Sequence, residues 1–176
     1  MANIQVHEKA FKLFISKEEI AKQVNRIAAE IDQDYENEIP LFIAILNGSF
    51  IFASDLIRSI NITAEISFVK VSSYEGTAVG NMNKLIGLNT DIKDRSIIII
   101  EDIVDTGNTL NKIMPYLKEQ QPKSIEIASL LSKPDAIKYP IEVAYNCFDI
   151  PNNFVVGYGL DYDGLGRQYA DIYQTI

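Results

Sequence analysis

Four consecutive isoleucines, Ile97 to Ile100, stand in the segment SIIIIED and constrain the fold more than any other feature of the chain. A strand with one face in water alternates apolar and polar residues, whereas an unbroken β-branched run fits a strand that is buried on both faces. Such strands occur almost only in parallel sheets that helices cover on both sides. The segment therefore predicts the central strand of an α/β fold.

The segments on either side of this run alternate between helical and strand patterns, as a parallel sheet with crossover helices requires. Ser16 and Glu19 form a capping-box pattern, which with the apolar residues that follow predicts a helix from about 17 to about 34. The turn at Asn47-Gly48 precedes a second helix, and the polar stretch 72–84, which has two glycines, predicts a loop. We expect one face of the second helix to be buried and to consist of Phe50, Ala53, Ile57 and Ile60. A third helix is predicted at about 108–120. Further strands are predicted at 41–46, 64–71, 124–131, 141–147 and 153–157.

The composition fits a folded protein with one core. A chain of 176 residues is long enough to form one domain over residues 1–176, and 47% hydrophobic and 23% charged residues are typical of globular proteins. The single cysteine, Cys147, excludes an intramolecular disulfide. Because the sequence has neither a signal-like start nor an apolar run of membrane-spanning length, we expect a cytoplasmic protein without a membrane segment. The predicted fold class is α/β, with a mainly parallel central sheet and helices on both faces.

The formal net charge of −8 restricts the possible partners. Proteins that bind nucleic acid obtain much of their affinity from clustered Lys and Arg side chains that neutralise phosphates. An acidic chain can still bind a phosphorylated small molecule through backbone amides, with a metal ion supplying positive charge. We therefore expect a small-molecule ligand and no nucleic-acid partner.

Ligands of doubly covered parallel sheets bind at the carboxyl ends of the strands, where this chain gathers acidic and hydroxyl side chains. Glu101 and Asp102 end the isoleucine strand, and the sequence DTGNT, 105–109, follows as a turn into the next helix. On its own, Asp105 or Thr106 would be read as the cap of that helix. The two threonines, the glycine and the free amides of a helix start also form a cradle for a phosphate group.

The acidic pair beside this cradle requires a further explanation, because carboxylates repel a phosphate. They can accept hydrogen bonds from ribose hydroxyls, or they can engage Mg²⁺, which prefers oxygen ligands and retains several waters. A sugar phosphate that carries hydroxyls and a metal ion satisfies both interpretations.

The segment IIIIEDIVDTGNTL resembles the phosphoribosyl-diphosphate (PRPP) binding motif of type I phosphoribosyltransferases. Four other segments, in the order expected, are similar to the hypoxanthine-guanine branch of this family, and the five together cover roughly residues 10–170. The resemblance implies the type I phosphoribosyltransferase fold with a small hood region, and a homodimer or homotetramer. The four segments are LNGSFIFASDLIRSI, VSSYEG, ASLLSKP and FVVGYGLDYDGLGRQ.

The resemblance also implies roles for the residues of the PRPP motif. The acidic pair would bind the ribose 2′- and 3′-hydroxyls, directly or through Mg²⁺, and the next aspartate would act as general acid or base near purine N7. The turn that follows would hold the 5′-phosphate. In this chain the acidic pair is Glu101 and Asp102, the acid or base is Asp105, and the turn is Thr106, Gly107, Asn108 and Thr109.

Three residues resemble the purine-binding groups of the family. Lys133 would donate to the purine 6-oxo group, and because an ammonium has only donors it would disfavour a 6-amino group. Phe154 would stack on the base, and Val155 would offer backbone groups to the base edge. Without the neighbouring motifs, Lys133 would be read as a solvated lysine before a proline turn and FVVGY as core.

The remaining matches concern pyrophosphate, metal and closure. The turn at Asn47 and Gly48 would present amides to pyrophosphate, often through a cis peptide, although Asn47 stands where Lys or Arg is common. Alone, Asp161 would be a turn acid and Arg167 part of a surface salt bridge. By resemblance Asp161 would hold a second Mg²⁺, Arg167 would face pyrophosphate, and Ser73 and Tyr74 would belong to a loop that closes over the site and excludes water.

The activity that the resemblance implies is transfer of the 5-phosphoribosyl group from PRPP to N9 of hypoxanthine or guanine, with Mg²⁺ as cofactor. The substrates would be PRPP and a 6-oxopurine. Alternatives are an RNA-binding regulator that retains the PRPP fold, which the net charge disfavours, and a phospho-receiver domain, whose acidic pair belongs near the first strand. Lys133 argues against an adenine-preferring homologue, whereas no residue separates hypoxanthine from xanthine.

Overall fold

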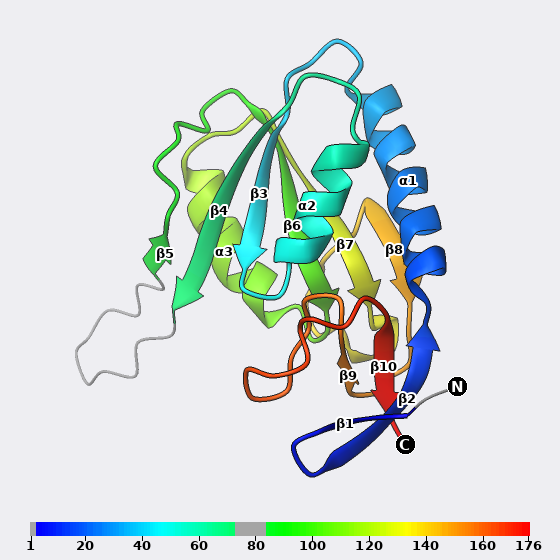
Figure 1. Cartoon of the computed structure of the whole chain (residues 1–176). Helices are drawn as coiled ribbons and strands as arrows, with labels where there is room; N and C mark the ends of the chain where they lie inside the picture. The colour runs from blue at the N-terminus through cyan, green and yellow to red at the C-terminus, as the bar shows by residue number, and fades with distance from the viewer. Residues whose placement is uncertain (1–2, 73–83) are drawn as a thin grey trace, which may run out of the picture.

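The computed structural model describes residues 3–72 and 84–176, and its centre is a six-stranded sheet (Figure 1). The strand order is β5-β4-β3-β6-β7-β8, in which all neighbours pair in parallel except the edge strand β5, which runs antiparallel to β4. This arrangement confirms the predicted α/β class. The strands are β3 (Leu41–Leu46), β4 (Glu65–Ser72), β5 (Lys84–Ile86), β6 (Ser96–Val104), β7 (Ser124–Ser132) and β8 (Tyr145–Asp149).

The isoleucine strand β6 occupies the centre of the sheet, between β3 and β7. All four residues from Ile97 to Ile100 are fully buried. Ile98 and Ile100 pack in the core on the side of α1 and α2, and Ile97 and Ile99 pack in the core on the side of α3. Each face of the strand thus meets a separate hydrophobic layer, which is why the run contains no polar residue.

Three helices cover the sheet. α1 (Lys17–Asp34) and α2 (Phe50–Ser59) lie on one face, and α3 (Asn108–Glu119) lies on the other (Figure 1). The start of α1 contains the predicted capping box between Ser16 and Glu19. Within the described ranges, none of these helices is long and apolar enough to cross a membrane.

A second sheet forms the hood, beyond the carboxyl ends of the parallel strands and close to both chain ends (Figure 1). Its four strands are antiparallel, in the order β1-β2-β10-β9. Its core consists of Val6, Phe11 and Val156. The strands are β1 (Ile4–Val6), β2 (Lys9–Ile15), β9 (Val155–Val156) and β10 (Ile172–Thr175).

Some predicted boundaries and faces are wrong. The strand predicted at 141–147 forms at 145–149, because Ile141 and Val143 pack beside the α3 layer before the chain joins the edge of β7. The strand predicted at 153–157 is shorter and pairs with β10 in the hood. Phe50 is 43% exposed, and the buried residues of α2 are Phe52, Ala53 and Leu56.

Candidate active site

The acidic pair lies at the carboxyl end of the central strand β6. Glu101 is 6% exposed, and its Oε2 atom has no hydrogen-bond partner within the described part of the chain. Burial raises the pKa of Glu101 well above its usual value, and the neighbouring charge of Asp102 raises it further. An unpartnered buried carboxylate is costly, which indicates that the site is arranged for a donor or a cation that binds from outside.

Asp102 lies against the turn between β3 and α2. A Cβ atom added to Gly48 would lie 1.5 Å from Oδ2 of Asp102, so only glycine permits this approach. Burial raises the pKa of Asp102 to about 6, the positive charge of Arg167 opposes that rise, and the negative charge of Asp161 adds to it. Three separate segments therefore converge here: the end of β6, the turn after β3 and the loop that contains Asp161 and Arg167.

The turn that precedes α3 borders a cavity of about 250 Å³, lined by Glu101 to Gly107 together with Thr109 and Leu110. Gly107, not Asp105 or Thr106, is the N-cap of the helix, with φ +77°, and it offers no side-chain acceptor to the first-turn amides. Thr106 Oγ1 accepts from the amide of Asn108 at 3.3 Å. The helix thus starts with an aligned set of donors beside a cavity, which is the geometry of an anion site.

Lys133 and Asp105 form an ion pair at the ends of neighbouring strands. Nζ of Lys133 lies 2.7 Å from Oδ2 of Asp105, and the side chains are 8% and 45% exposed. The lysine is therefore buried rather than solvated, and its backbone amide donates to the carbonyl of Val104 at 2.9 Å. Oδ1 of Asn152 accepts from the same ammonium at 3.4 Å, a contact that the sequence does not predict, because the segment PNN is typical of a turn.

Phe154 and Val155 lie in the hood. The Phe154 ring is 42% exposed, and its edge-to-face neighbour Tyr162 has its ring centroid 5.4 Å away. The ammonium of Lys9 lies 5.1 Å from the centre of the Phe154 ring. Val155 is buried in β9 and pairs with Gln174 of β10, so its side chain belongs to the core.

Asp161 and Arg167 pair with each other in the loop between β9 and β10. Nη2 of Arg167 lies 2.6 Å from Oδ1 of Asp161, and Nη1 donates to the carbonyl of Gly159 at 2.6 Å. Both residues are partly buried. The guanidinium is thereby held in one orientation beside the backbone of Gly159, and its positive charge acts on Asp102.

Two further predictions concern the loops around the site. The peptide between Leu46 and Asn47 is cis, as the resemblance suggested. Ser73 and Tyr74 lie outside the described residues. Ser49, which the sequence analysis did not select, is fully buried and donates to the carbonyl of Ile45 at 2.6 Å, so it fixes the turn that contains Asn47 and Gly48.

The carboxylates at the site fit a Mg²⁺ ion that the protein and a bound substrate coordinate together. No group of three or more His, Cys, Asp or Glu side chains suited to a metal occurs in the ranges 3–72 and 84–176. A complete protein cage is therefore not formed there. Mg²⁺ is commonly bound by one or two carboxylates together with waters and substrate phosphates, which is the number of carboxylates that Glu101 and Asp102 provide.

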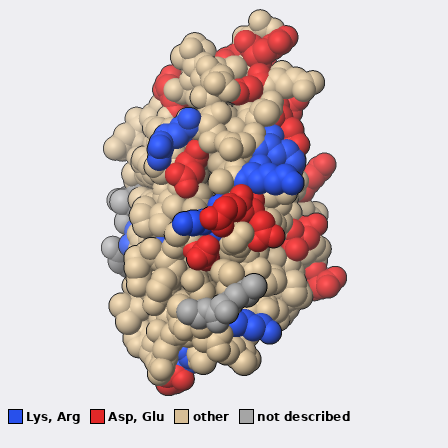
Figure 2. Space-filling view, turned by 45° about the vertical axis from the view of Figure 1, so that its right-hand side comes forward, with Lys and Arg blue, Asp and Glu red and all other residues tan. Residues whose placement is uncertain are grey.

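Positive and negative side chains are interspersed on the visible face of the molecule (Figure 2). On the face shown in Figure 2, Lys and Arg side chains occur in small groups that Asp and Glu side chains interrupt. The chain as a whole has a net charge of −8. A surface that neutralises a nucleic-acid backbone requires a broad basic patch instead.

Comparison with known proteins gives consistent results. Residues 15–163 match the model of the phosphoribosyl transferase domain. The chain is 41% identical, over 153 residues, to a hypoxanthine-guanine phosphoribosyltransferase of Bacillus subtilis, with 86% of this chain and 85% of that protein covered. A hypoxanthine-guanine phosphoribosyltransferase of Streptococcus pneumoniae is 40% identical over the same length and coverage. A crystal structure of a hypoxanthine-guanine phosphoribosyltransferase from Bacillus anthracis superposes with a TM-score of 0.86 at 34% identity, covering 94% of this chain and 98% of that one.

Proposed function

The chain belongs to the family of proteins with a phosphoribosyl transferase domain, and from that premise we propose that it transfers the 5-phosphoribosyl group of PRPP to N9 of hypoxanthine, and of guanine. The products are IMP or GMP and pyrophosphate, which places the enzyme in purine salvage. Relatives that are about 40% identical over 86% of the chain and bear the name hypoxanthine-guanine phosphoribosyltransferase support this substrate class.

The observation that supports the proposal most directly is the 2.7 Å separation between Nζ of Lys133 and Oδ2 of Asp105. A 6-oxopurine presents O6 and N7 side by side on one edge, and both are acceptors. A lysine donor next to a carboxyl group matches that edge, because the ammonium can donate to O6 while Asp105 exchanges a proton at N7. A 6-amino group would instead place a donor against the ammonium, so adenine is disfavoured.

The ribose 5-phosphate half of PRPP occupies the cavity at the end of β6. The 5′-phosphate binds the amides and hydroxyls of the Thr106–Thr109 turn, and the 2′- and 3′-hydroxyls meet Glu101 and Asp102. The unpartnered Oε2 atom of Glu101 supports this assignment, since a hydroxyl donor or a cation would satisfy it. Neutral amides thus bind the phosphate, and the acids bind hydroxyls and metal.

Pyrophosphate binds between the turn at Asn47 and Gly48 and the guanidinium of Arg167. Glu101, Asp102 and, at a second position, Asp161 would hold Mg²⁺, which when bound would supply positive charge next to the leaving pyrophosphate. Arg167 orients the same group, and Phe154 stacks on the purine while Val155 offers backbone groups to its edge.

Several properties of the whole protein belong to the same proposal. The chain is one domain over residues 1–176, it works in the cytoplasm, and it assembles as a homodimer or homotetramer. Its partners are PRPP and a 6-oxopurine, with no nucleic acid.

Two alternatives differ from this proposal in what they predict. A xanthine-preferring enzyme would have the same Lys133 contact, because xanthine also has a 6-oxo group, but its kcat/KM would be higher for xanthine than for hypoxanthine. A regulator that kept the fold would bind PRPP without forming nucleotide.

The test is the formation of nucleotide and pyrophosphate from hypoxanthine, guanine or xanthine with PRPP and Mg²⁺, followed by chromatography, with PRPP binding measured in parallel by calorimetry. We expect turnover that requires all three components. PRPP binding with no turnover of any purine would contradict the enzyme and support the regulator.

A further inference from the structure

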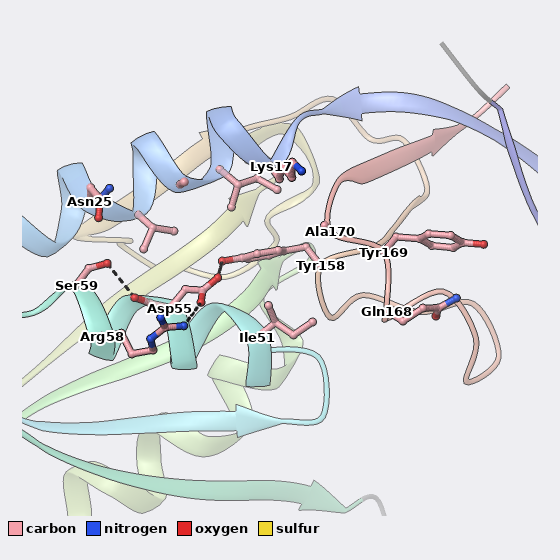
Figure 3. A pocket seen from close by; sticks show the side chains of 13 residues that line it. Lys17, Asn25, Ile51, Asp55, Arg58, Ser59, Tyr158, Gln168, Tyr169 and Ala170 are labelled. Atoms are coloured by element: carbon pink, nitrogen blue, oxygen red, sulfur yellow. Dashed lines mark hydrogen bonds and ion pairs between the residues drawn. The ribbon is translucent and has the colours of Figure 1, made fainter.

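Tyr158 connects two parts of the molecule that both take part in the proposed pyrophosphate site. Its hydroxyl donates to Oδ2 of Asp55 at 2.6 Å, and the residue is 6% exposed (Figure 3). Asp55 lies on α2, which begins directly after the turn at Asn47 and Gly48. Tyr158 itself begins the loop that contains Asp161 and Arg167. The hydrogen bond therefore spans from α2 to this loop.

The backbones of these two parts are in contact beside the hydrogen bond. A Cβ atom added to Gly159 would lie 2.2 Å from the carbonyl oxygen of Gly48. The amide of Gly159 donates to the carbonyl of Arg167 at 3.1 Å, and the Arg167 guanidinium donates back to the carbonyl of Gly159 at 2.6 Å. The position of Gly159 thus sets the distance between the Gly48 turn and the Arg167 guanidinium.

Tyr158 adopts a conformation that requires support from its surroundings. Its φ is +50°, in the left-handed region that aromatic residues seldom occupy. Its amide donates to the carbonyl of Tyr169 at 2.7 Å, which holds the backbone, whereas the hydroxyl bond to Asp55 holds the side chain. Residues in such conformations persist only when several contacts fix them, and they are concentrated at functional sites.

A cavity of about 560 Å³ lies next to this hydrogen bond, between α1, α2 and residues 168–170 (Figure 3). Asp55 and Tyr158 both line it, and the side chain of Asp55 is 42% exposed. The ring of Tyr158 belongs to the same hydrophobic core as Phe52 and Leu56 of α2, whereas Asp55 and Tyr158 both border the cavity. The hydrogen bond to Asp55 adds a directional polar contact to this packing and fixes the position of the Tyr158 hydroxyl.

We infer that Tyr158 and Asp55 form a latch that positions the Gly48 turn against Arg167, so that both meet the pyrophosphate half of PRPP together. The inference rests on the proposed function. Neither residue touches substrate in this account; both act through the backbone of Gly159. Loss of the latch should weaken pyrophosphate binding and leave purine binding almost unchanged.

The test compares Tyr158→Phe and Asp55→Asn with a matched control, Tyr145→Phe. Tyr145 is also 6% exposed, and its hydroxyl donates to Asp34 on α1 at 2.8 Å, but it lies at the opposite end of its strand from the site. Calorimetry gives the Kd for magnesium pyrophosphate without requiring turnover. Steady-state kinetics give KM for PRPP, KM for hypoxanthine and kcat.

For Tyr158→Phe we expect the Kd for pyrophosphate and the KM for PRPP to rise by about three- to tenfold. The lost hydrogen bond is charge-assisted, and part of its free energy holds the pyrophosphate-binding groups in position. The KM for hypoxanthine should stay within about twofold. Asp55→Asn should show a smaller rise, since it retains an acceptor oxygen, and it provides a second variant if Tyr158→Phe does not fold. Tyr145→Phe should bind pyrophosphate like the unsubstituted protein.

Unchanged pyrophosphate binding by folded Tyr158→Phe would overturn the latch, and so would an equal loss in Tyr145→Phe. Failure of the proposed function is separate, because it would appear as absent nucleotide formation by the unsubstituted protein.

Discussion

Asp105 is the residue on which the proposed chemistry depends most. Its side chain is 45% exposed and paired with Lys133. The carboxylate is therefore both held in place and accessible to a bound purine. Asp105→Asn preserves the shape but removes the proton acceptor. We expect kcat to fall by about 10²- to 10⁴-fold, the usual contribution of a general acid or base.

The KM for PRPP should change little in Asp105→Asn, because the proposed phosphate contacts come from the following amides. Steady-state kinetics at saturating hypoxanthine measure both constants. Asp135→Asn alters an exposed carboxylate two residues beyond Lys133 and serves as the control. Normal turnover by Asp105→Asn would remove this residue from proton transfer.

Asp102 illustrates the conflict between stability and binding at one position. Burial raises its pKa from 3.8 to about 6, so the folded state holds the proton more tightly than the unfolded chain. The stability contribution of this group is therefore greatest below about pH 4 and is lost as the pH rises towards 6 and above. A shift of this size corresponds to an upper limit of roughly 3 kcal/mol at 1.36 kcal/mol per pKa unit.

Asp102→Asn should therefore increase the free energy of unfolding relative to the unsubstituted protein, by more at pH 8 than at pH 4, while PRPP affinity falls. Urea denaturation at both pH values measures the difference, and Asp135→Asn again serves as control. If the difference in free energy of unfolding between the two proteins were the same at pH 4 and pH 8, burial would not destabilise the ionised Asp102 carboxylate.

At the scale of elements, the turn between β3 and α2 is defined by the contact of Gly48 with Asp102. An added methyl group would overlap Oδ2 of Asp102, with 1.5 Å between the atoms, so Gly48→Ala must displace either the turn or the carboxylate. We expect a loss of PRPP affinity of tenfold or more. Gly164→Ala is the control, because its Cβ would meet no atom within 4 Å.

Gly164 has φ +84°, so this control variant incurs backbone strain of about 1 kcal/mol but no collision. Calorimetric titration with PRPP compares the two variants. Equal affinities would mean that the approach of Gly48 to Asp102 has no importance for binding.

The elements that the sequence predicted well are those whose signals are local. The capping box and apolar spacing placed α1 at 17–34, and the isoleucine run placed β6, because burial on both faces leaves a clear pattern in few residues. Of the hood strands only β9 was predicted, within the range 153–157; β1, β2 and β10 were not, since strands as short as Ile4–Val6 carry little periodicity and β10 pairs with β2, far away in the chain.

The same distinction applies to the site. The PRPP motif is continuous in sequence, so its position at the end of β6 was predictable from strand topology. Asn152 beside Lys133, and Asp55 beside Tyr158, were not, because each pair joins residues that the chain separates widely and whose types are common in turns and helices.

At the scale of the whole molecule, the parallel sheet and the hood have different parts in the proposed reaction. The sheet presents the PRPP motif and Lys133 at its carboxyl edge, and the hood presents the exposed Phe154 ring. In the proposed reaction the base would contact both parts, and PRPP would contact the sheet edge and the Arg167 loop, which connects β9 and β10. A measurement of base selectivity therefore tests the sheet and the hood together.

The central claim is that Lys133 selects a 6-oxopurine, and the most direct test is kcat/KM for hypoxanthine, guanine, xanthine and adenine with PRPP and Mg²⁺. The measurement is made on the unsubstituted protein, Lys133→Met and the exposed-lysine control Lys112→Met. We expect hypoxanthine, with or without guanine, to react and adenine not to. The preference over adenine should fall by about 10²-fold or more only in Lys133→Met, because the donor is lost there. Comparable use of adenine by the unsubstituted protein, or an unchanged preference in Lys133→Met, would contradict the account.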